Sequence, residues 1–298
     1  MRKINDALRQ VAVKLLQSGQ VDLVLGYTKG PGASQSVPYV AASPGEASHL
    51  CFDATSTKAL SKYLLQDGFQ GRKTALVVKG CDYRAVRLML DENRIERERV
   101  FLIGVDCPGM LRQSRKEDEQ ELSPFCLSCQ HNSPPAEDVD VLLTEGSGWP
   151  KAQSRQEAFP EIGAIERMSD DERYEYWKRQ LNRCKRCYTC RNACPVCTCR
   201  VCLFDRENPD YIDGAKDQLA QHQFYHVIRS FHVADRCVGC GECYRACPEG
   251  IPLHLMHQKL QQELDRFYGI YKAGVDELPT PLSHAHADEP DFFGKGGK

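Results

Sequence analysis

The stretch CKRCYTCRNACP, residues 184–195, decides how the second half of the chain is organised. Its four cysteines follow the spacing C-x2-C-x2-C-x3-C-P, and CVGCGECYRACP at residues 237–248 repeats that spacing. Three cysteines this close can surround one 4Fe-4S cubane, while the fourth reaches the cubane held by the other stretch. The repeat therefore predicts two 4Fe-4S clusters.

Each expected ligand set combines the three closely spaced cysteines of one stretch with the last cysteine of the other. An alternative is a pair of structural zinc sites, because C-x2-C also recurs in zinc ribbons. Four cysteines in each stretch, the last followed by proline, favour cubanes and a ferredoxin-like α+β domain. The first set is Cys184, Cys187, Cys190 and Cys247, and the second set is Cys237, Cys240, Cys243 and Cys194.

Three further cysteines, Cys197, Cys199 and Cys202, follow the first stretch directly and belong to neither set. They can complete an unusual cluster, replace a fourth ligand or serve as buried thiols beside a cluster. The spacing does not choose among these three roles.

Cysteine usage and charge point to the cytoplasm. The 298 residues include 16 cysteines and begin with MRKINDALRQ, which lacks the apolar core of a signal peptide. Thiols stay reduced in the cytoplasm, so dense cysteine there indicates metal rather than disulfides. A formal charge of -2 gives no broad basis for binding nucleic acid, and no apolar run is long enough to span a membrane.

The first half of the chain alternates helical and strand patterns. This alternation predicts an α/β domain with a mainly parallel sheet over residues 1–148. The expected helices cover residues 3–18, 58–68 and 83–92, and the expected strands cover residues 21–27, 74–80, 99–105 and 139–146.

Residues 149–168 are expected to form a linker, because they are rich in Gly, Pro and Ser without apolar periodicity. Ser169 and Glu172 form a capping box that opens the two-cluster domain, residues 169–275, with Tyr174, Trp177 and Leu181 as an apolar stripe. Residues 276–298 are expected to be a tail, in which His284 and His286 are solvated.

Four cysteines of the first half can hold a third cluster. Cys126 and Cys129 form a C-x2-C pair, while Cys81 and Cys107 end two adjacent expected strands. Parallel strands end at one edge of a sheet, so these thiols can meet there. The alternative is that Cys81 and Cys107 are small buried hydrophobic residues.

The segments VDLVLGY, KALSKYLL, ALVVKGC, VFLIGVDCPG and CLSCQHNSPPAEDVDVLLTEG cover most of residues 20–146. Through them the chain resembles the beta-subunit family of deazaflavin-dependent hydrogenases and formate dehydrogenases. The resemblance implies a flavin, FAD, and a hydride-accepting coenzyme. The two-cluster half resembles bacterial proteins that accompany formate dehydrogenase, hydrogenase or heterodisulfide-reductase-like complexes. The resemblance maps the ligands of an N-terminal 4Fe-4S cluster onto Cys81, Cys107, Cys126 and Cys129, the N-terminal set.

We therefore expect an iron-sulfur electron-transfer subunit of a cytoplasmic redox complex. Its partner would be a formate dehydrogenase, a hydrogenase or a heterodisulfide-reductase-like flavoprotein. No Ser-His-Asp or paired-carboxylate constellation indicates independent acid-base catalysis, so no catalytic residue is predicted. The alternative is a flavin-containing oxidoreductase subunit that exchanges hydride with a deazaflavin or nicotinamide. Gly30, Pro31 and Gly32 can border a phosphate, although a surface turn is the simpler interpretation.

Overall fold

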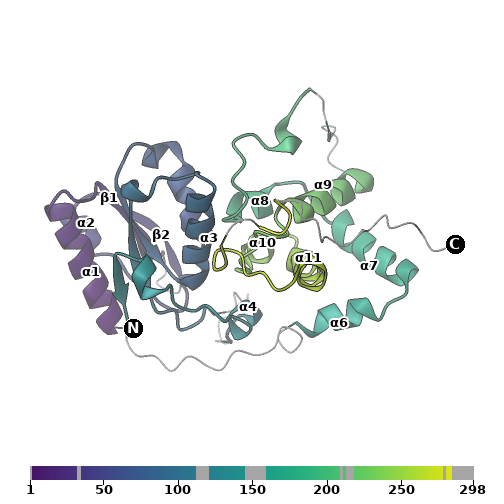
Figure 1. Cartoon of the computed structure of the whole chain (residues 1–298), viewed down its shortest axis with the longest axis horizontal. Coiled ribbons are helices and arrows are strands. Elements are labelled where there is room, and N and C mark those ends of the chain that lie inside the picture. The colour runs from purple at the N-terminus through teal and green to yellow at the C-terminus, as the bar shows by residue number, and fades with distance from the viewer. Residues whose placement is uncertain are drawn as a thin grey trace.

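The computed structural model describes residues 2–31, 35–111, 121–144, 159–208, 211–212, 218–277 and 280–283. A sheet domain made by the first half of the chain lies beside a helical region made by the second half, with helix α3 between them (Figure 1). His284, His286 and Gly32 lie outside the described residues. No helix in the described ranges is long and apolar enough to cross a membrane.

The sheet has five strands in the order β2-β1-β3-β4-β5. Strands β1, β3, β4 and β5 are parallel, and only β2 at the edge pairs antiparallel, with β1. The expected α/β domain with a mainly parallel sheet is confirmed. The strands are β1 (Leu23–Lys29), β2 (Ser36–Ala41), β3 (Thr74–Val78), β4 (Val100–Val105) and β5 (Val141–Leu143).

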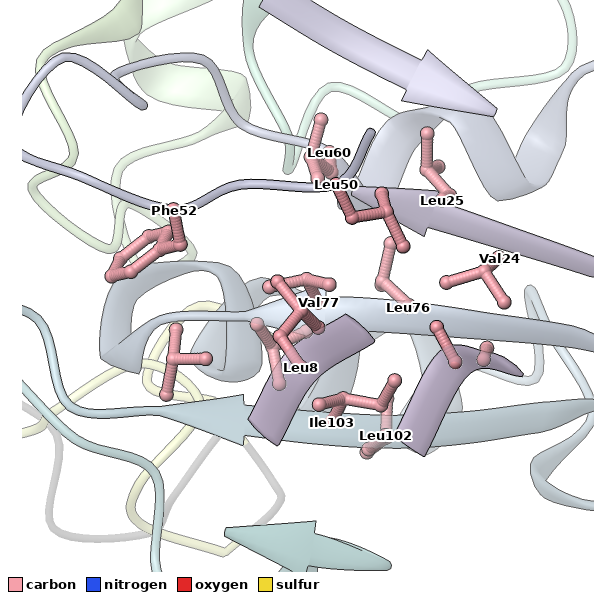
Figure 2. Packing of buried hydrophobic residues seen from close by; sticks show 14 of the residues in the cluster. Leu8, Val24, Leu25, Leu50, Phe52, Leu60, Leu76, Val77, Leu102 and Ile103 are labelled. Carbon is pink, nitrogen blue, oxygen red and sulfur yellow. The ribbon is translucent and has the colours of Figure 1, made fainter. Parts of the chain in front are cut away.

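Helices cover both faces of this sheet. Helix α1 (Arg2–Gln17) lies over one face and α3 (Gly80–Asp91) over the other (Figure 1). The central strands are buried on both sides, as parallel strands between helices must be, and β3 is buried at every position. Figure 2 shows Leu8 of α1 close to Val77 and Ile103 of the sheet, within a core drawn wholly from residues 4–143. Shorter helices in this half are α2 (Pro44–Ala47), α4 (Pro124–Leu127) and the 3-10 turns η1 (Ser61–Leu65), η2 (Asp67–Phe69), η3 (Arg97–Arg99) and η4 (Ala136–Asp138).

Two expectations for the sheet domain were wrong in detail. The α-helix expected over residues 58–68 is replaced by the 3-10 turns η1 and η2, because Gln66 between them is extended and interrupts the helix. Strand β2 was not predicted, since Pro38 inside it removes a backbone donor. Proline is tolerated at this position because β2 is an edge strand.

The second half consists of helices and ligand-bearing loops, and its described residues contain no strand of the sheet. The predicted capping box at Ser169 and Glu172 is confirmed at the start of α7. The helices are α6 (Pro160–Glu166), α7 (Asp170–Asn182), α8 (Thr189–Ala193), α9 (Leu219–His232), α10 (Glu242–Arg245) and α11 (Leu253–Tyr268), with the 3-10 turn η5 (Leu203–Asp205).

Three further expectations need correction. The proposed linker is helical at residues 160–166, where Ile162 is buried against Phe125 and Leu255. Tyr174 is exposed and lies under the ammonium of Lys178, so it is not a core residue. The described start of the proposed tail packs onto the molecule, because the Thr280 hydroxyl donates to Asp235 and is buried.

The two halves share apolar contacts at two places. Ala85 and Leu88 of α3 pack with Val233 and Val238 of the second half. Phe125, in α4, packs with a second-half group that includes Phe159 and Leu255. The surface beside the N-terminal set is therefore built jointly by both halves.

Candidate metal centres

The N-terminal set meets at the carboxyl edge of the parallel strands. Cys81 lies in the first turn of α3, Cys107 follows β4, and Cys126 and Cys129 come from α4 and the loop after it. All four line one cavity of about 440 Å³. Three chain segments that are distant in sequence thus bring their thiols together, and the sheet topology predicts this meeting for Cys81 and Cys107.

Burial and mutual proximity act on these thiols in the same direction. Burial raises the pKa of Cys81 well above its usual value, and the neighbouring Cys107 and Cys129 raise it further. Burial likewise raises the pKa of Cys107 to about 12. Thiolates in such a place need a positive charge to compensate them, which cluster iron would supply.

A buried lysine lies beside the same cavity. Lys79 is 3% exposed, and its Nζ lies 2.7 Å from Asp82 Oδ2 and 2.8 Å from the hydroxyl of Tyr27. Asp82 is 1% exposed, so the pair is removed from water. The Lys79 cation lowers the thiol pKa of Cys107 while burial raises it.

The first set also converges. Burial raises the pKa of Cys184 to about 11, with further contributions from the nearby thiolates of Cys190, Cys247 and Cys187. Cys247 comes from the second stretch, so the structure brings the outlying cysteine to the three residues that the spacing predicted.

The second set shows the reciprocal arrangement. Burial raises the pKa of Cys243, Arg229 lowers it, and the thiolates of Cys194 and Cys237 raise it further. Cys240 also lies close enough to Cys194 for that thiolate to raise its pKa. Cys194, from the first stretch, is therefore brought to the three cysteines of the second.

The two stretches share a backbone pattern. Arg186 and Tyr188 have positive φ values of 44° and 59°, and the equivalent positions of the second stretch are Gly239 at 70° and Gly241 at 76°. Positive φ is strained for residues other than glycine, and such strain persists where the surroundings over-determine it. The pattern curls each loop around its cysteines.

Backbone amides point at the sulfurs from these curled loops. The amide of Arg186 donates to Cys184 Sγ at 3.3 Å, and that of His131 donates to Cys129 Sγ at 3.4 Å. Gly109 and Gly239 make the same contact two residues after Cys107 and Cys237. Amide donors stabilise the anionic sulfur ligands of iron-sulfur clusters. All sixteen cysteines are free thiols, and the three sets fit cubanes in number and donors, with every member except Cys187 buried or partly buried.

No three Cys, His, Asp or Glu side chains in the described ranges stand close enough to share a single metal ion. Cubane ligands differ in this respect, because they surround a core of eight atoms and need not touch one another.

Three of the four cysteines outside the sets face a different space. Cys197, Cys199 and Cys202 all line a cavity of about 1340 Å³ between the two halves. Burial raises the pKa of Cys197 to about 11, with Cys194 next in effect. The lining of this cavity includes eight arginine and lysine residues and three acids. These bases are Lys58, Lys62, Arg72, Arg94, Arg99, Arg191, Arg200 and Arg245.

Helix α9 places polar side chains beside the cysteines that were not predicted, among them His226 and Arg229. The sequence could have indicated this polar helix face, because His222, His226 and Arg229 are spaced four and three residues apart.

A protein-family model agrees with the layout of the two cysteine stretches. Residues 180–251 match the model of the 4Fe-4S dicluster domain. The F420-dependent formate dehydrogenase subunit beta of Methanocaldococcus jannaschii is 24% identical over an alignment 354 positions long, gaps included, which covers 90% of this chain and 91% of that protein. The F420-dependent formate dehydrogenase 1 subunit beta of Methanococcus maripaludis is also 24% identical, covering 90% of each. A chain of the F420-reducing [NiFe] hydrogenase complex from Methanosarcina barkeri is 18% identical, covers 36% of this chain and 38% of that one, and has a TM-score of 0.29.

The fold and the matched domain define an iron-sulfur electron-transfer protein, with a mainly parallel α/β domain and a 4Fe-4S dicluster domain. More particularly, the chain is similar to the beta subunits of two F420-dependent formate dehydrogenases over nine-tenths of its length.

Proposed function

We propose that the chain carries three 4Fe-4S clusters and conducts electrons through them within a cytoplasmic redox complex. The N-terminal, first and second sets would each hold one cluster. The observation that carries the proposal is that three groups of four cysteines converge, each with amide donors directed at its sulfurs, and that all of these cysteines except Cys187 are buried or partly buried.

The sets also follow one another in space. Cys237 and Cys240 line the cavity that holds the N-terminal set, and the thiolate of Cys81 raises the pKa of Cys240 after burial and Glu242. On its other side, the second set adjoins Cys190 of the first set. The second cluster would therefore be the middle one, and electrons would cross it on the way between the other two.

Magnetic coupling tests this order without any partner. In the fully reduced protein each paramagnetic cluster should broaden the resonance signals of its neighbours. Cys243→Ser should remove the middle cluster and leave two signals without mutual coupling. The matched variant Cys129→Ser should remove an end cluster and leave a coupled pair. A coupled pair that survives loss of the middle cluster would contradict the order.

The partner that we propose is the catalytic subunit of a formate dehydrogenase, because the beta subunits of two such enzymes align along 90% of this chain. Hydrogenase and heterodisulfide-reductase-like flavoproteins are the alternatives. Sixteen free thiols suit a reducing compartment.

Addition of formate to a complex purified anaerobically from the native host tests the partner. Formate should bleach the visible absorbance of the clusters and produce their reduced resonance signals, whereas dihydrogen should not. Reduction by dihydrogen alone would replace formate dehydrogenase by hydrogenase. Clusters that neither compound reduces would contradict both partners.

A second function is favoured by the large basic cavity. Its volume of about 1340 Å³ exceeds the roughly 300–1,000 Å³ of ordinary small-molecule sites. Its excess of cations suits the phosphates of a dinucleotide. Cys197, next to Cys194 of the second set, lines it. FAD bound there would exchange hydride with a deazaflavin or nicotinamide and single electrons with the clusters.

Denaturation of the anaerobically purified chain tests this second function. About one flavin per chain should be released, and Arg72→Ser in the cavity wall should reduce that amount, while Arg179→Ser on α7 should not. Full iron content with no flavin would leave electron transfer as the whole function.

A further inference from the structure

Helix α9 has an inverted arrangement of polar and apolar side chains. Its buried residues are all polar or aromatic with a polar group, whereas Phe224, Val227 and Phe231 are exposed. A surface helix ordinarily buries its apolar side. This inversion indicates that the groups packed beneath α9 are charged or polar. The cysteines of the first and second sets lie beneath this helix. The buried residues are His222, Tyr225, His226, Arg229 and Ser230.

Arg229 lies between the first and second sets. It is 3% exposed, and its Nη2 donates to the carbonyl of Cys190 at 2.9 Å. Its Nη1 lies 3.0 Å from Nε2 of His257. Burial lowers the pKa of Arg229, but the thiolates of Cys194, Cys190 and Cys243 outweigh burial and raise it. The same guanidinium thus lies near thiolates of both sets.

No carboxylate pairs with Arg229 in the described part of the chain, and its buried Nε has no partner there. An unpaired buried cation is strongly unfavourable unless negative charge compensates it. The anionic clusters are the compensation available, since thiolates of both sets lie nearby.

His226 acts on the first set alone. Its Nε2 lies 3.2 Å from Cys184 Sγ. A thiolate only accepts hydrogen bonds, so Nε2 carries the hydrogen and donates. Tyr225 adds a weaker contact, with its hydroxyl 3.8 Å from Cys190 Sγ.

We propose that α9 sets the reduction potentials of the two clusters, with Arg229 as a fixed cation that raises both and His226 as a donor that raises the first alone. This inference rests on the ligand sets of the proposed function. Reduction adds one electron to a cluster and makes it more negative, so a nearby cation or sulfur hydrogen bond stabilises the reduced form. Arg229 and His226 are positioning residues, because they act through the cluster ligands.

A redox titration of the anaerobically purified full chain, followed by electron paramagnetic resonance, tests the inference. The signal of the first cluster is identified by its change in Cys187→Ser. Arg229→Gln should shift both potentials downward, and Arg229→Lys, which keeps the charge, should shift them less. His226→Phe should lower only the first potential. Arg183→Gln is the matched control, because this arginine adjoins Cys184 but is exposed, so water screens its charge and neither potential should move.

Iron and sulfide content distinguish a failure of the proposed function from a failure of the inference about α9. Clusters missing from the unaltered chain would contradict the proposed function itself. Unchanged potentials in fully loaded Arg229→Gln protein, or equal shifts of both potentials in His226→Phe, would overturn the role of α9. If Arg229→Gln fails to assemble its clusters, Arg229→Lys and His226→Phe decide. A fully loaded His226→Phe protein whose first potential does not fall would then overturn the proposal.

Discussion

The sheet domain and the helical region hold their buried thiols in opposite ways. In the sheet domain, a continuous apolar core of strands and covering helices exists without the ligands, and only Cys107 of the N-terminal set is a buried member of it. In the helical region the apolar clusters are small, and Cys184 and Cys190 are themselves buried members of one of them. The proposed N-terminal cluster would therefore be added at the edge of a finished fold. The second half uses its clusters as its core.

Removal of iron should produce the largest difference between the two halves. Metal-binding free energy is folding free energy wherever the ligands form the core. After chelation under reducing conditions, the backbone amides of α7–α11 should lose nearly all protection from hydrogen exchange, while β1, β3 and β4 keep theirs. The control is the same chelator already saturated with iron. Equal loss of protection in the sheet would contradict the comparison and the proposed domain division near residue 150.

Substitution of one outlying ligand should remove one cluster. Cys194 belongs to the first stretch by sequence but lies among the cysteines of the second set. Cys194→Ser should therefore abolish the resonance signal of the second cluster and lower iron content by up to about four per chain. The matched variant Cys199→Ser alters an exposed thiol outside all three sets and should keep every signal. Damage confined to the first cluster would refute cross-ligation.

A smaller change should affect the N-terminal cluster alone. A Cβ added at Gly80 would overlap the carbonyl oxygen of His131, which belongs to the loop that follows Cys129. Gly80→Ala should thus push that loop away, destabilise the protein by about 1–3 kcal/mol and weaken the N-terminal signal. Gly68→Ala is the control, because nothing lies within 4 Å of its added Cβ. Thermal unfolding and the resonance spectrum measure both effects, and a full N-terminal signal in Gly80→Ala would contradict this packing.

The contact between the halves should weaken in mild acid. His254 packs against Phe125, Phe159 and Tyr244, and burial lowers its pKa to about 4. In the unfolded protein the His254 ring has its ordinary pKa, which is higher than its pKa in the folded protein. Below that ordinary pKa the unfolded state binds more protons than the folded state, so the free energy of unfolding falls as pH falls. The loss between pH 7 and pH 5 should be about 2 kcal/mol.

Hydrogen exchange of α11, corrected for the intrinsic effect of pH, measures this loss. His254→Phe should reduce the loss by about 2 kcal/mol, because it removes this titrating group and keeps an aromatic ring. Parallel losses in both proteins would assign the acid sensitivity to other groups.

Local patterns predicted much of this molecule, and contacts between distant segments account for what they missed. Strands β1, β3 and β4 could be predicted because buried parallel strands read as continuous apolar runs. The meeting of Cys81 with Cys107 followed from the rule that parallel strands end at one edge. Strand β2 could not be predicted, since only its edge position makes Pro38 acceptable. The role of Arg229 was equally hidden, because its polar helix face makes sense only once the cysteines beneath it are known.

Iron and acid-labile sulfide content of the anaerobically purified full chain tests the central claim most directly. Three cubanes predict about twelve irons and about twelve sulfides per chain. About eight of each would mean that only the two-cluster region holds clusters. Cys81, Cys107, Cys126 and Cys129 would then be core residues without iron. Zinc with negligible sulfide would contradict the account in both halves of the molecule.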